Sequence, residues 1–396
     1  MSVYARLGIR TLINARGDAT LAGGTLMAPE VVEAMASAAR SFVRIADLQD
    51  AAGRLIAGAT GAEAGYVTAG AAAGLTLGTA AILAGLDPDR MDRLPRTDGR
   101  DGILVQASHR NGYDHLVRAS GARLVEVGGG EGATADELEA AIDDTVVGAF
   151  FQGDNEMLGL PVEAFIEVAH RHHLPVLVDA SVNLPPRSNL RRFVAAGADL
   201  VTFSGGKTIR GPQASGIIAG RLDLIRSVAL QHQDMDVLPE TWSHRALLES
   251  GVLRRIPQHG IGRSMKAGKE EIVGLIVALE RYLERNEAAE TAEWLGHAHA
   301  LEAGLGAIPG VDAWTEAWSP TGRPVPACMA RIDAQAFGCN AFEIVRALAD
   351  RDPMVLVGDH RAAEGLLRFD PENLDQGGVE TVIAAVAELR PAAARH

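Results

Sequence analysis

An aspartate and a lysine each follow a short apolar segment that is typical of a buried strand. Asp179 comes directly after residues 176–178, and Lys207 follows residues 200–203 through the flexible segment 204–206. A lysine amine can be tuned to act as a nucleophile or a base, whereas arginine stays charged. A carboxylate at the end of a buried strand needs a partner, which is a cation in a functional site or a cap or salt bridge in a structural one.

Lysine is rare in this chain of 396 residues. The sequence has 37 Lys+Arg, of which only Lys207, Lys266 and Lys269 are lysines. The search for a reactive amine therefore has three candidates. Because ligands of open α/β sheets bind beyond the carboxyl ends of the strands, Lys207 is the strongest of the three.

Two further predicted strands are followed by residues that could bind a ligand. Tyr66-Val67-Thr68 leads through Ala69 into Gly70, Ala71 and Ala72, small residues that open a helix. Bare amides at a helix N-terminus can bind phosphate, although tight helix packing would also explain small residues here. The strand at residues 103–105 is followed by His109, whose ring could stack on a cofactor or play a structural role.

A lysine, an acid and a phosphate-type turn at neighbouring strand ends match the needs of pyridoxal 5'-phosphate. Its aldehyde forms a Schiff base with a lysine, its ring nitrogen favours a carboxylate, and its phosphate favours backbone amides. The segment FSGGKTIRGPQASGIIAG (203–220) closely resembles the lysine segment of the seryl-tRNA selenium transferase-like group of fold-type I pyridoxal phosphate enzymes. Within that group, the chain looks most like D-glucosaminate-6-phosphate ammonia-lyase-type proteins. Further similar segments are INARGDATLAGG (13–24), TGAEAGYVTAGAAAGL (60–75), HRNGYDH (109–115), LVDAS (177–181) and IGRSMKAGKEEIVGL (261–275).

The resemblance implies a role for each matched residue. It implies that Lys207 forms the Schiff base, Asp179 pairs with the ring nitrogen and His109 stacks on the ring. It also implies a homodimer with shared active sites, in which Arg263 and Lys266 either reach a phosphate in the partner's site or have a plain surface role. The remaining cofactor contacts that it implies are Gly70, Ala71 and Ala72 as phosphate amides, Asn155 near the ring oxygen and Ser204 at the phosphate.

Three other residues are candidates for the substrate site. Arg361 and Arg368 could bind a substrate carboxylate, for which the bidentate guanidinium is well suited. Tyr113 either lines the substrate pocket or packs locally. The sequence differs from that of the selenium transferases at Gly206, where those enzymes commonly carry an acid. Because the similar segment INARGD begins at residue 13, the N-terminal tRNA-binding portion of those enzymes is not expected here.

Alternating strands and helices predict an α/β fold with a mostly parallel sheet covered on both faces. The resemblance specifies this as the fold-type I pyridoxal phosphate-dependent transferase fold. It has a seven-stranded-type sheet between helices and a smaller C-terminal α/β domain. The expected organisation is an N-terminal segment at 1–60, a large cofactor-binding domain at 61–268, and a linking helix with the small domain at 269–396.

Composition excludes several other classes of function. The formal charge of −14 without a basic block argues against nucleic-acid binding. Two cysteines are too few for a disulfide scaffold, and the His170–His173 segment lacks matched acids, so no metal site is expected. The uncharged run at 64–86 is long enough to span a membrane, but its composition favours a strand, a turn and a buried helix. Without a secretion signal, a cytoplasmic protein is expected.

The expected function is a lyase that acts on a small amino acid or a 2-amino sugar acid. Removal of the α-proton and β-elimination would release ammonia and a 2-keto acid. The same lysine would also serve a racemase, an epimerase or an aminotransferase, so these alternatives stay open. A catalytically idle relative of the same fold is the non-enzyme alternative.

Overall fold

The computed structural model describes residues 2–390 and divides the chain into two compact units. The larger unit runs from Met27 to Glu284, and the smaller one combines the residues up to Leu26 with those from Arg285 onward. These boundaries differ from the expected ones at residues 60 and 268. The reason is that strand β1 (Leu12–Ala15) pairs with β11 (Met354–Val357), whereas helix α12 (Lys269–Glu284) packs on α2 (Pro29–Ala39).

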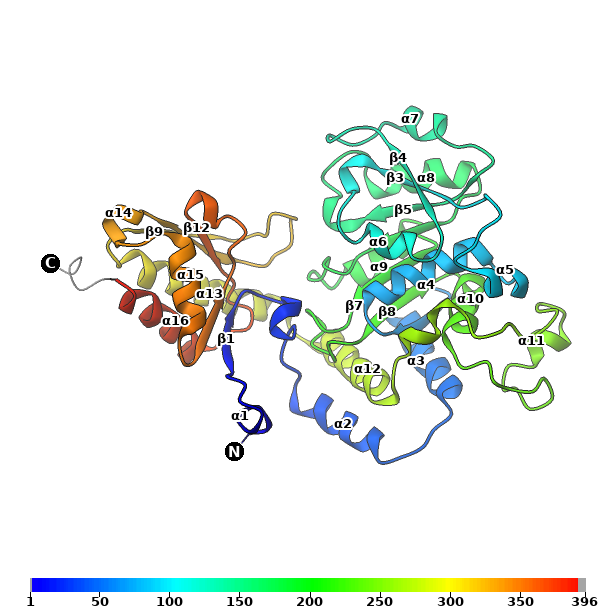
Figure 1. Ribbon diagram of the computed structural model, residues 1–396, viewed down its shortest axis with the longest axis horizontal. Coiled ribbons are helices and arrows are strands. Elements are labelled where there is room, and N and C mark those ends of the chain that lie inside the picture. Colours follow the sequence, from blue (N-terminus) through cyan, green and yellow to red (C-terminus); the bar gives the residue numbers. More distant parts are fainter. Residues whose placement is uncertain (1, 391–396) are drawn as a thin grey trace. The chain divides into compact units, whose positions relative to one another are not determined.

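A seven-stranded sheet forms the centre of the larger unit (Figure 1). Its strand order is β2-β8-β7-β6-β5-β3-β4, and all strands are parallel except β8. The sheet class expected from the sequence is therefore confirmed. The strands are β2 (Ala64–Thr68), β3 (Gly102–Gln106), β4 (Arg123–Val127), β5 (Val146–Gln152), β6 (Val176–Asp179), β7 (Leu200–Ser204) and β8 (Gly216–Gly220).

Apolar side chains on both faces of this sheet are covered by helices. Adjacent strand residues point to opposite faces, so Leu177 packs into one core cluster and Val178 into the other. Helices α4 (Ala71–Ala84) and α10 (Leu222–His232) cover the face of Leu177. The opposite face carries α3 (Ile45–Thr60), α8 (Val162–Arg171), α9 (Asn189–Ala195) and α12.

The long uncharged segment forms β2 and α4, as its composition indicates. In α4 every residue except Ala72 and Ile82 is buried within the unit. A helix that is apolar all round is one that packs inside a protein core. No helix within residues 2–390 is long and apolar enough to cross a membrane.

The smaller unit has its own sheets and core. Strands β9 (Val311–Glu316), β10 (Ala327–Ile332) and β12 (Leu366–Phe369) form an antiparallel sheet. Helices α13 (Glu287–Gly306), α15 (Ala341–Asp350) and α16 (Gln376–Glu388) pack around a core that includes Leu301 and Leu367. A smaller C-terminal α/β domain is thus present, with an added strand from the N-terminus.

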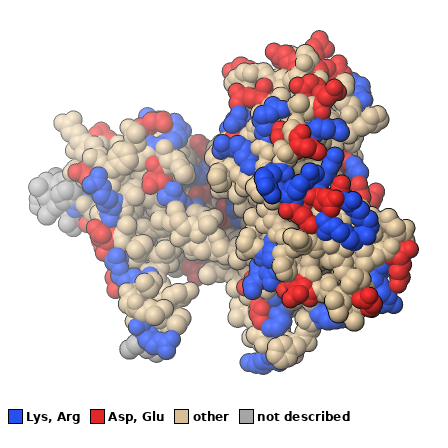
Figure 2. Space-filling view, turned by 45° about the vertical axis from the view of Figure 1, so that its right-hand side comes forward, with Lys and Arg blue, Asp and Glu red and all other residues tan. Residues whose placement is uncertain are grey.

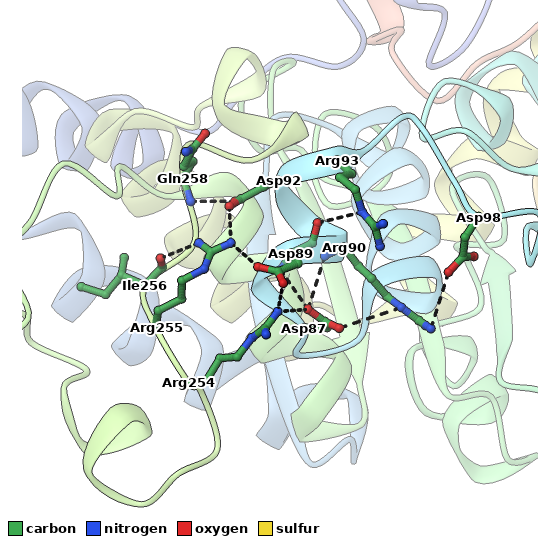
Figure 3. Close-up of polar contacts among 10 residues, drawn as sticks. All are labelled: Asp87, Asp89, Arg90, Asp92, Arg93, Asp98, Arg254, Arg255, Ile256 and Gln258. Carbon is green, nitrogen blue, oxygen red and sulfur yellow. Dashed lines mark hydrogen bonds and ion pairs between the residues drawn. The ribbon is translucent and has the colours of Figure 1, made fainter.

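Acidic and basic side chains are interspersed on the face that Figure 2 shows. One network of ion pairs connects residues 254–258 to a short helix. Arg255 lies 2.6 Å from both Asp89 and Asp92 on helix α5 (Pro88–Arg93) (Figure 3). Arg254 lies 3.2 Å from Asp87, the residue before this helix. The backbone amide of Gln258 also donates to Asp92 at 2.7 Å. These contacts fix the segment that leads into the short helix η4 (Ile261–Met265).

Candidate active site

The carboxyl ends of β2, β5, β6 and β7 meet at one edge of the large sheet. Asp179 is the register partner of Gln152 on one side and of Thr202 on the other. Because side chains alternate along a strand, Asp179 points to the same face as Leu177, which is the face that α4 covers. Thr202 lies on this face too, since its hydroxyl is 3.4 Å from the carbonyl of Ala71.

The turn before α4 has the geometry of an anion site. Gly70 has φ +105°, a conformation that L side chains rarely adopt, and a Cβ there would meet nothing within 4 Å. The first amides of a helix have no acceptor within it, so those of Ala71 and Ala72 can bind an external anion. Gly216 on β8 packs against this turn, because a Cβ on it would lie 2.5 Å from the nitrogen of Ala71.

Asp179 is buried, with only 2% of its surface exposed. Its Oδ1 accepts a hydrogen bond of 2.9 Å from the amide of Ser181. Burial raises the pKa of Asp179, while hydrogen bonds from Ser181 and the charge of Lys207 act in the opposite direction. A carboxylate in this position is stabilised by a cation placed against it.

Lys207 lies in the tight turn after β7, at the same edge. The turn is closed by hydrogen bonds from the amide of Gly205 to the carbonyl of Ser215 (2.9 Å) and from that of Gly211 to Gly205 (2.8 Å). A Cβ on Gly206 would lie 2.6 Å from the Cα of Gln213. This close approach explains why the position before Lys207 holds glycine rather than an acid.

These residues fit the three parts of pyridoxal phosphate. The turn at Gly70 supplies amides and open space for a phosphate, and Asp179 supplies a buried carboxylate for a ring cation. Lys207 supplies the amine. Ser204 lies three residues before Lys207 and is half-buried. It is the register partner of Gly216, which packs against the turn at Gly70.

His109 has a different environment from the one that a stacking residue needs. It has no exposed surface, and its ring meets Phe151 edge to face with centroids 4.6 Å apart. Nδ1 accepts from the amide of Gln152 at 3.2 Å, and Nε2 donates to the carbonyl of Leu158 at 3.0 Å. Burial lowers the pKa of His109, consistent with a neutral ring. The geometry therefore favours a positioning role over the predicted stacking, since neither ring face is open.

Asn155 also makes a structural contact. Its side-chain amide donates to the carbonyl of Ser108 at 3.0 Å, so it ties the loop after β5 to the loop after β3. The same loop carries Asp154, whose charge acts on the pKa of Asp179 and which the sequence analysis did not single out. Its position two residues after a buried strand was the signal that could have identified it.

The other predicted residues are exposed, are paired with an acid or belong to the smaller unit. Tyr113 is 61% exposed, and Arg263 pairs with Asp234 at 3.2 Å. In the smaller unit, Arg361 is exposed and pairs with Glu364, whereas Arg368 donates to Asp370 at 2.7 Å. The structure therefore does not bring Arg361 or Arg368 together with Lys207 in one compact unit. Within residues 2–390, no group of three or more His, Cys, Asp or Glu is arranged to hold a metal ion.

Comparison with known proteins shows which family the chain belongs to. Residues 12–236 match the family model described as "SelA: L-seryl-tRNA selenium transferase". A D-glucosaminate-6-phosphate ammonia lyase from Salmonella typhimurium is 31% identical over 99% of both chains. A 5'-C-glycyluridine monooxygenase-decarboxylase from a Streptomyces species is also 31% identical, over 98% of this chain and 91% of its own.

Solved structures agree with this relationship. The structure of a D-glucosaminate-6-phosphate ammonia-lyase superposes with a TM-score of 0.79 at 30% identity, covering 98% of this chain and 99% of its own. A serine palmitoyltransferase from S. paucimobilis has a TM-score of 0.57 at 14% identity, covering 96% of this chain and 87% of its own. The latter likeness concerns the fold alone, which is that of fold-type I pyridoxal phosphate enzymes. The chain is thus an enzyme and a member of the L-seryl-tRNA selenium transferase (SelA) family.

Proposed function

We propose that this enzyme is a pyridoxal phosphate-dependent lyase that releases ammonia and a 2-keto acid from a small amino acid or a 2-amino sugar acid. The observation that carries the proposal is the joint placement of Lys207, Asp179 and the Gly70 turn at one sheet edge. The full-length similarity to an ammonia lyase supports this reaction.

Each part of this sheet edge has its own task in the proposed reaction. The amides of Ala71 and Ala72 would hold the cofactor phosphate, the carboxylate of Asp179 would keep the ring nitrogen protonated, and the amine of Lys207 would hold the aldehyde end of the cofactor. When bound, the cofactor supplies an electron sink that makes the α-proton of the substrate acidic. Nζ of Lys207 takes that proton and then gives a proton to the leaving β-hydroxyl, which departs as water. The released enamine reacts with water to yield the 2-keto acid and ammonia.

The substrate is a small molecule with a primary amine rather than an aminoacyl-tRNA. The formal charge of −14 opposes binding of a polyanion. We propose further that the enzyme is a cytoplasmic homodimer. Light scattering of the purified protein tests the homodimer, which a monomeric mass would overturn.

The cofactor is tested by absorbance. Wild-type protein with pyridoxal phosphate should absorb at the violet edge of the visible range and keep that band after dialysis. Lys207→Ala should lose the band, while Lys269→Ala, which removes an amine engaged with Glu270, should retain it. An unchanged band in Lys207→Ala would exclude Lys207 as the bonding amine.

The reaction is tested with a panel of D- and L-amino acids and 2-amino sugar acids in deuterated water. Ammonia and the 2-keto acid should appear in equal amounts. Exchange of the α-hydrogen without ammonia would reject the lyase and favour a racemase or an epimerase. Carbon dioxide release with oxygen consumption would favour the reaction of the Streptomyces relative.

A further inference from the structure

A pocket of about 540 Å³ in the larger unit is lined by the first residues of β2, the edge strand of the large sheet. Helix α3 contributes a second wall, and helix α10 contributes a third through residues three or four positions apart, which share one helix face. The segment that contains the short helix α11 (Ala246–Glu249) contributes the fourth. This volume lies in the range of pockets that bind small molecules.

The buried part of the lining is mainly apolar. Its larger buried side chains are Tyr66, Ile225, Leu230, Met235 and Trp242. The polar groups among the buried residues are satisfied within the protein. The side chain of Gln49 bonds both backbone groups of Val67, and the hydroxyl of Tyr66 lies 2.9 Å from Nδ1 of His232. This part of the pocket therefore favours an apolar ligand group, whose burial from water is favourable.

Two acidic side chains line the pocket as well, and each is engaged by a group other than an arginine. Asp50 lies 3.1 Å from Nε2 of His244. Oε2 of Glu63 accepts a hydrogen bond of 2.9 Å from the amide of Leu222 at the start of α10. Neither acid forms an ion pair with the cations of the pocket.

Those cations are Arg54 on α3, which is exposed, and Arg226 on α10, which is half-buried. Within residues 2–390, the side chains of both make no ion pair or hydrogen bond. By contrast, Arg221, the residue before α10, pairs with Asp199 at 3.0 Å and with Asp223 at 2.6 Å. Two unpaired guanidiniums next to an apolar lining fit a carboxylate that carries an apolar group.

We propose that this pocket binds an aliphatic monocarboxylate. The apolar chain of the ligand packs against Leu230 and Trp242, and Arg226 holds its carboxylate with Arg54 beside it. Arg226 is the main contact, because a half-buried charge is screened less by solvent and salt than an exposed one. The ligand needs no amine and no phosphate, so the pocket serves a ligand other than the substrate and the cofactor.

The test uses the cofactor-loaded enzyme and two probes, octanoate and octan-1-ol, which share a chain length and differ in charge. Calorimetry should show that wild-type protein binds octanoate at least about tenfold more tightly, as expected for a charge-assisted contact. Arg226→Gln should remove most of that preference, and the double variant with Arg54→Gln should abolish it. Arg118→Gln is the matched control, since Arg118 is exposed, lies outside the pocket and has no ion pair within residues 2–390.

Tryptophan emission reports where octanoate binds. Trp242 lines the pocket, whereas Trp294, Trp314 and Trp318 belong to the smaller unit. Octanoate should therefore change the emission of wild-type protein and leave that of Trp242→Phe unchanged. Ala57→Leu, which adds volume to the α3 wall, should weaken the binding of both probes alike.

Four results would overturn the proposal. These are equal affinity of wild-type protein for the two probes, an unchanged preference in the double variant, an equal loss in Arg118→Gln, and an emission change that persists in Trp242→Phe. The affinity for octanoate should also be the same in Lys207→Ala, because Lys207 does not line this pocket. A weaker affinity there would place octanoate at the cofactor edge and would likewise exclude the pocket. Binding is measured without turnover, so these outcomes are independent of the lyase reaction.

Discussion

Gly216 on β8 and Ala71 at the start of α4 are in backbone contact, since a Cβ on Gly216 would lie 2.5 Å from the nitrogen of Ala71. The strand therefore supports the turn that offers amides to a phosphate. No side chain fits between the two segments, so the position of the turn depends on glycine at 216.

Gly216→Ala should push this turn away from its position. We expect the dissociation constant of pyridoxal phosphate to rise at least tenfold and the free energy of unfolding to fall by about 1–3 kcal/mol, as for other overpacked sites. Titration of cofactor absorbance and denaturant unfolding measure the two effects. Gly58→Ala, at an exposed helix position with nothing within 4 Å, is the control and should stabilise by about 0.5–1 kcal/mol. Normal cofactor affinity in Gly216→Ala would show that the turn tolerates the shift.

Asp179→Asn should lower turnover by about 100-fold or more, because it removes the charge that holds the ring nitrogen protonated. The amide oxygen can still accept from Ser181, so the fold should be retained. Steady-state kinetics of the loaded enzyme checks this expectation. Asp144→Asn, which changes an exposed acid, should leave turnover unaffected. Wild-type turnover in Asp179→Asn would remove the carboxylate from the mechanism.

The same carboxyl group should affect the stability of the cofactor-free protein. Because burial raises the pKa of Asp179 in the folded state, the folded protein holds its proton to higher pH than the unfolded chain does. Its contribution to stability therefore falls as the pH rises above about 4, the usual pKa of aspartate. Cofactor-free Asp179→Asn should lose less stability over that range than wild-type protein, and parallel unfolding curves would contradict this prediction.

His109→Asn should destabilise the fold by about 1–3 kcal/mol, since the bonds to Gln152 and Leu158 depend on the ring. Burial lowers the pKa of His109, so its contribution is present above about pH 6.5 and is lost as the pH falls below that value. Unfolding of wild-type protein between pH 7.5 and 5.5 should therefore show a steeper loss than that of the variant. The exposed His360→Asn change serves for comparison and should keep the wild-type slope.

Tyr66→Phe should cost about 1–3 kcal/mol of unfolding free energy, because it leaves Nδ1 of buried His232 without its donor. Thermal and denaturant unfolding measure the loss. Tyr4→Phe removes a hydroxyl from a side chain that is 55% exposed and should change little. If both variants matched wild-type protein, the hydrogen bond between Tyr66 and His232 would not contribute to stability.

The positions of Asp179 and Lys207 could be predicted from sequence because both follow short apolar strands of a parallel sheet. Period-two alternation and common strand direction then bring such residues to one edge. The environment of His109 could not be predicted, because it depends on the loop carrying Leu158 folding back over β3. The same holds for the pairing of Leu12 with Met354, which joins segments far apart in the chain.

The pocket of the larger unit that is lined by Arg44, His232 and Lys266 could not be predicted from sequence patterns either. Arg44, His232 and Lys266 come from three separate segments, and only the packing of α3, α10 and η4 unites them. The matched segment at 261–275 indicated that Lys266 matters, but not which group it faces.

The three lysines lie in three distinct chemical environments. Lys207 is half-buried in a tight turn, Lys266 is exposed at the pocket, and Lys269 is engaged by Glu270 at the first residue of α12. An acylating reagent followed by peptide mass spectrometry would consequently distinguish them by rate, with Lys266 modified first. Since arginine does not react, the labelling pattern of these few amines would report separately on the cofactor site, the pocket and the helix.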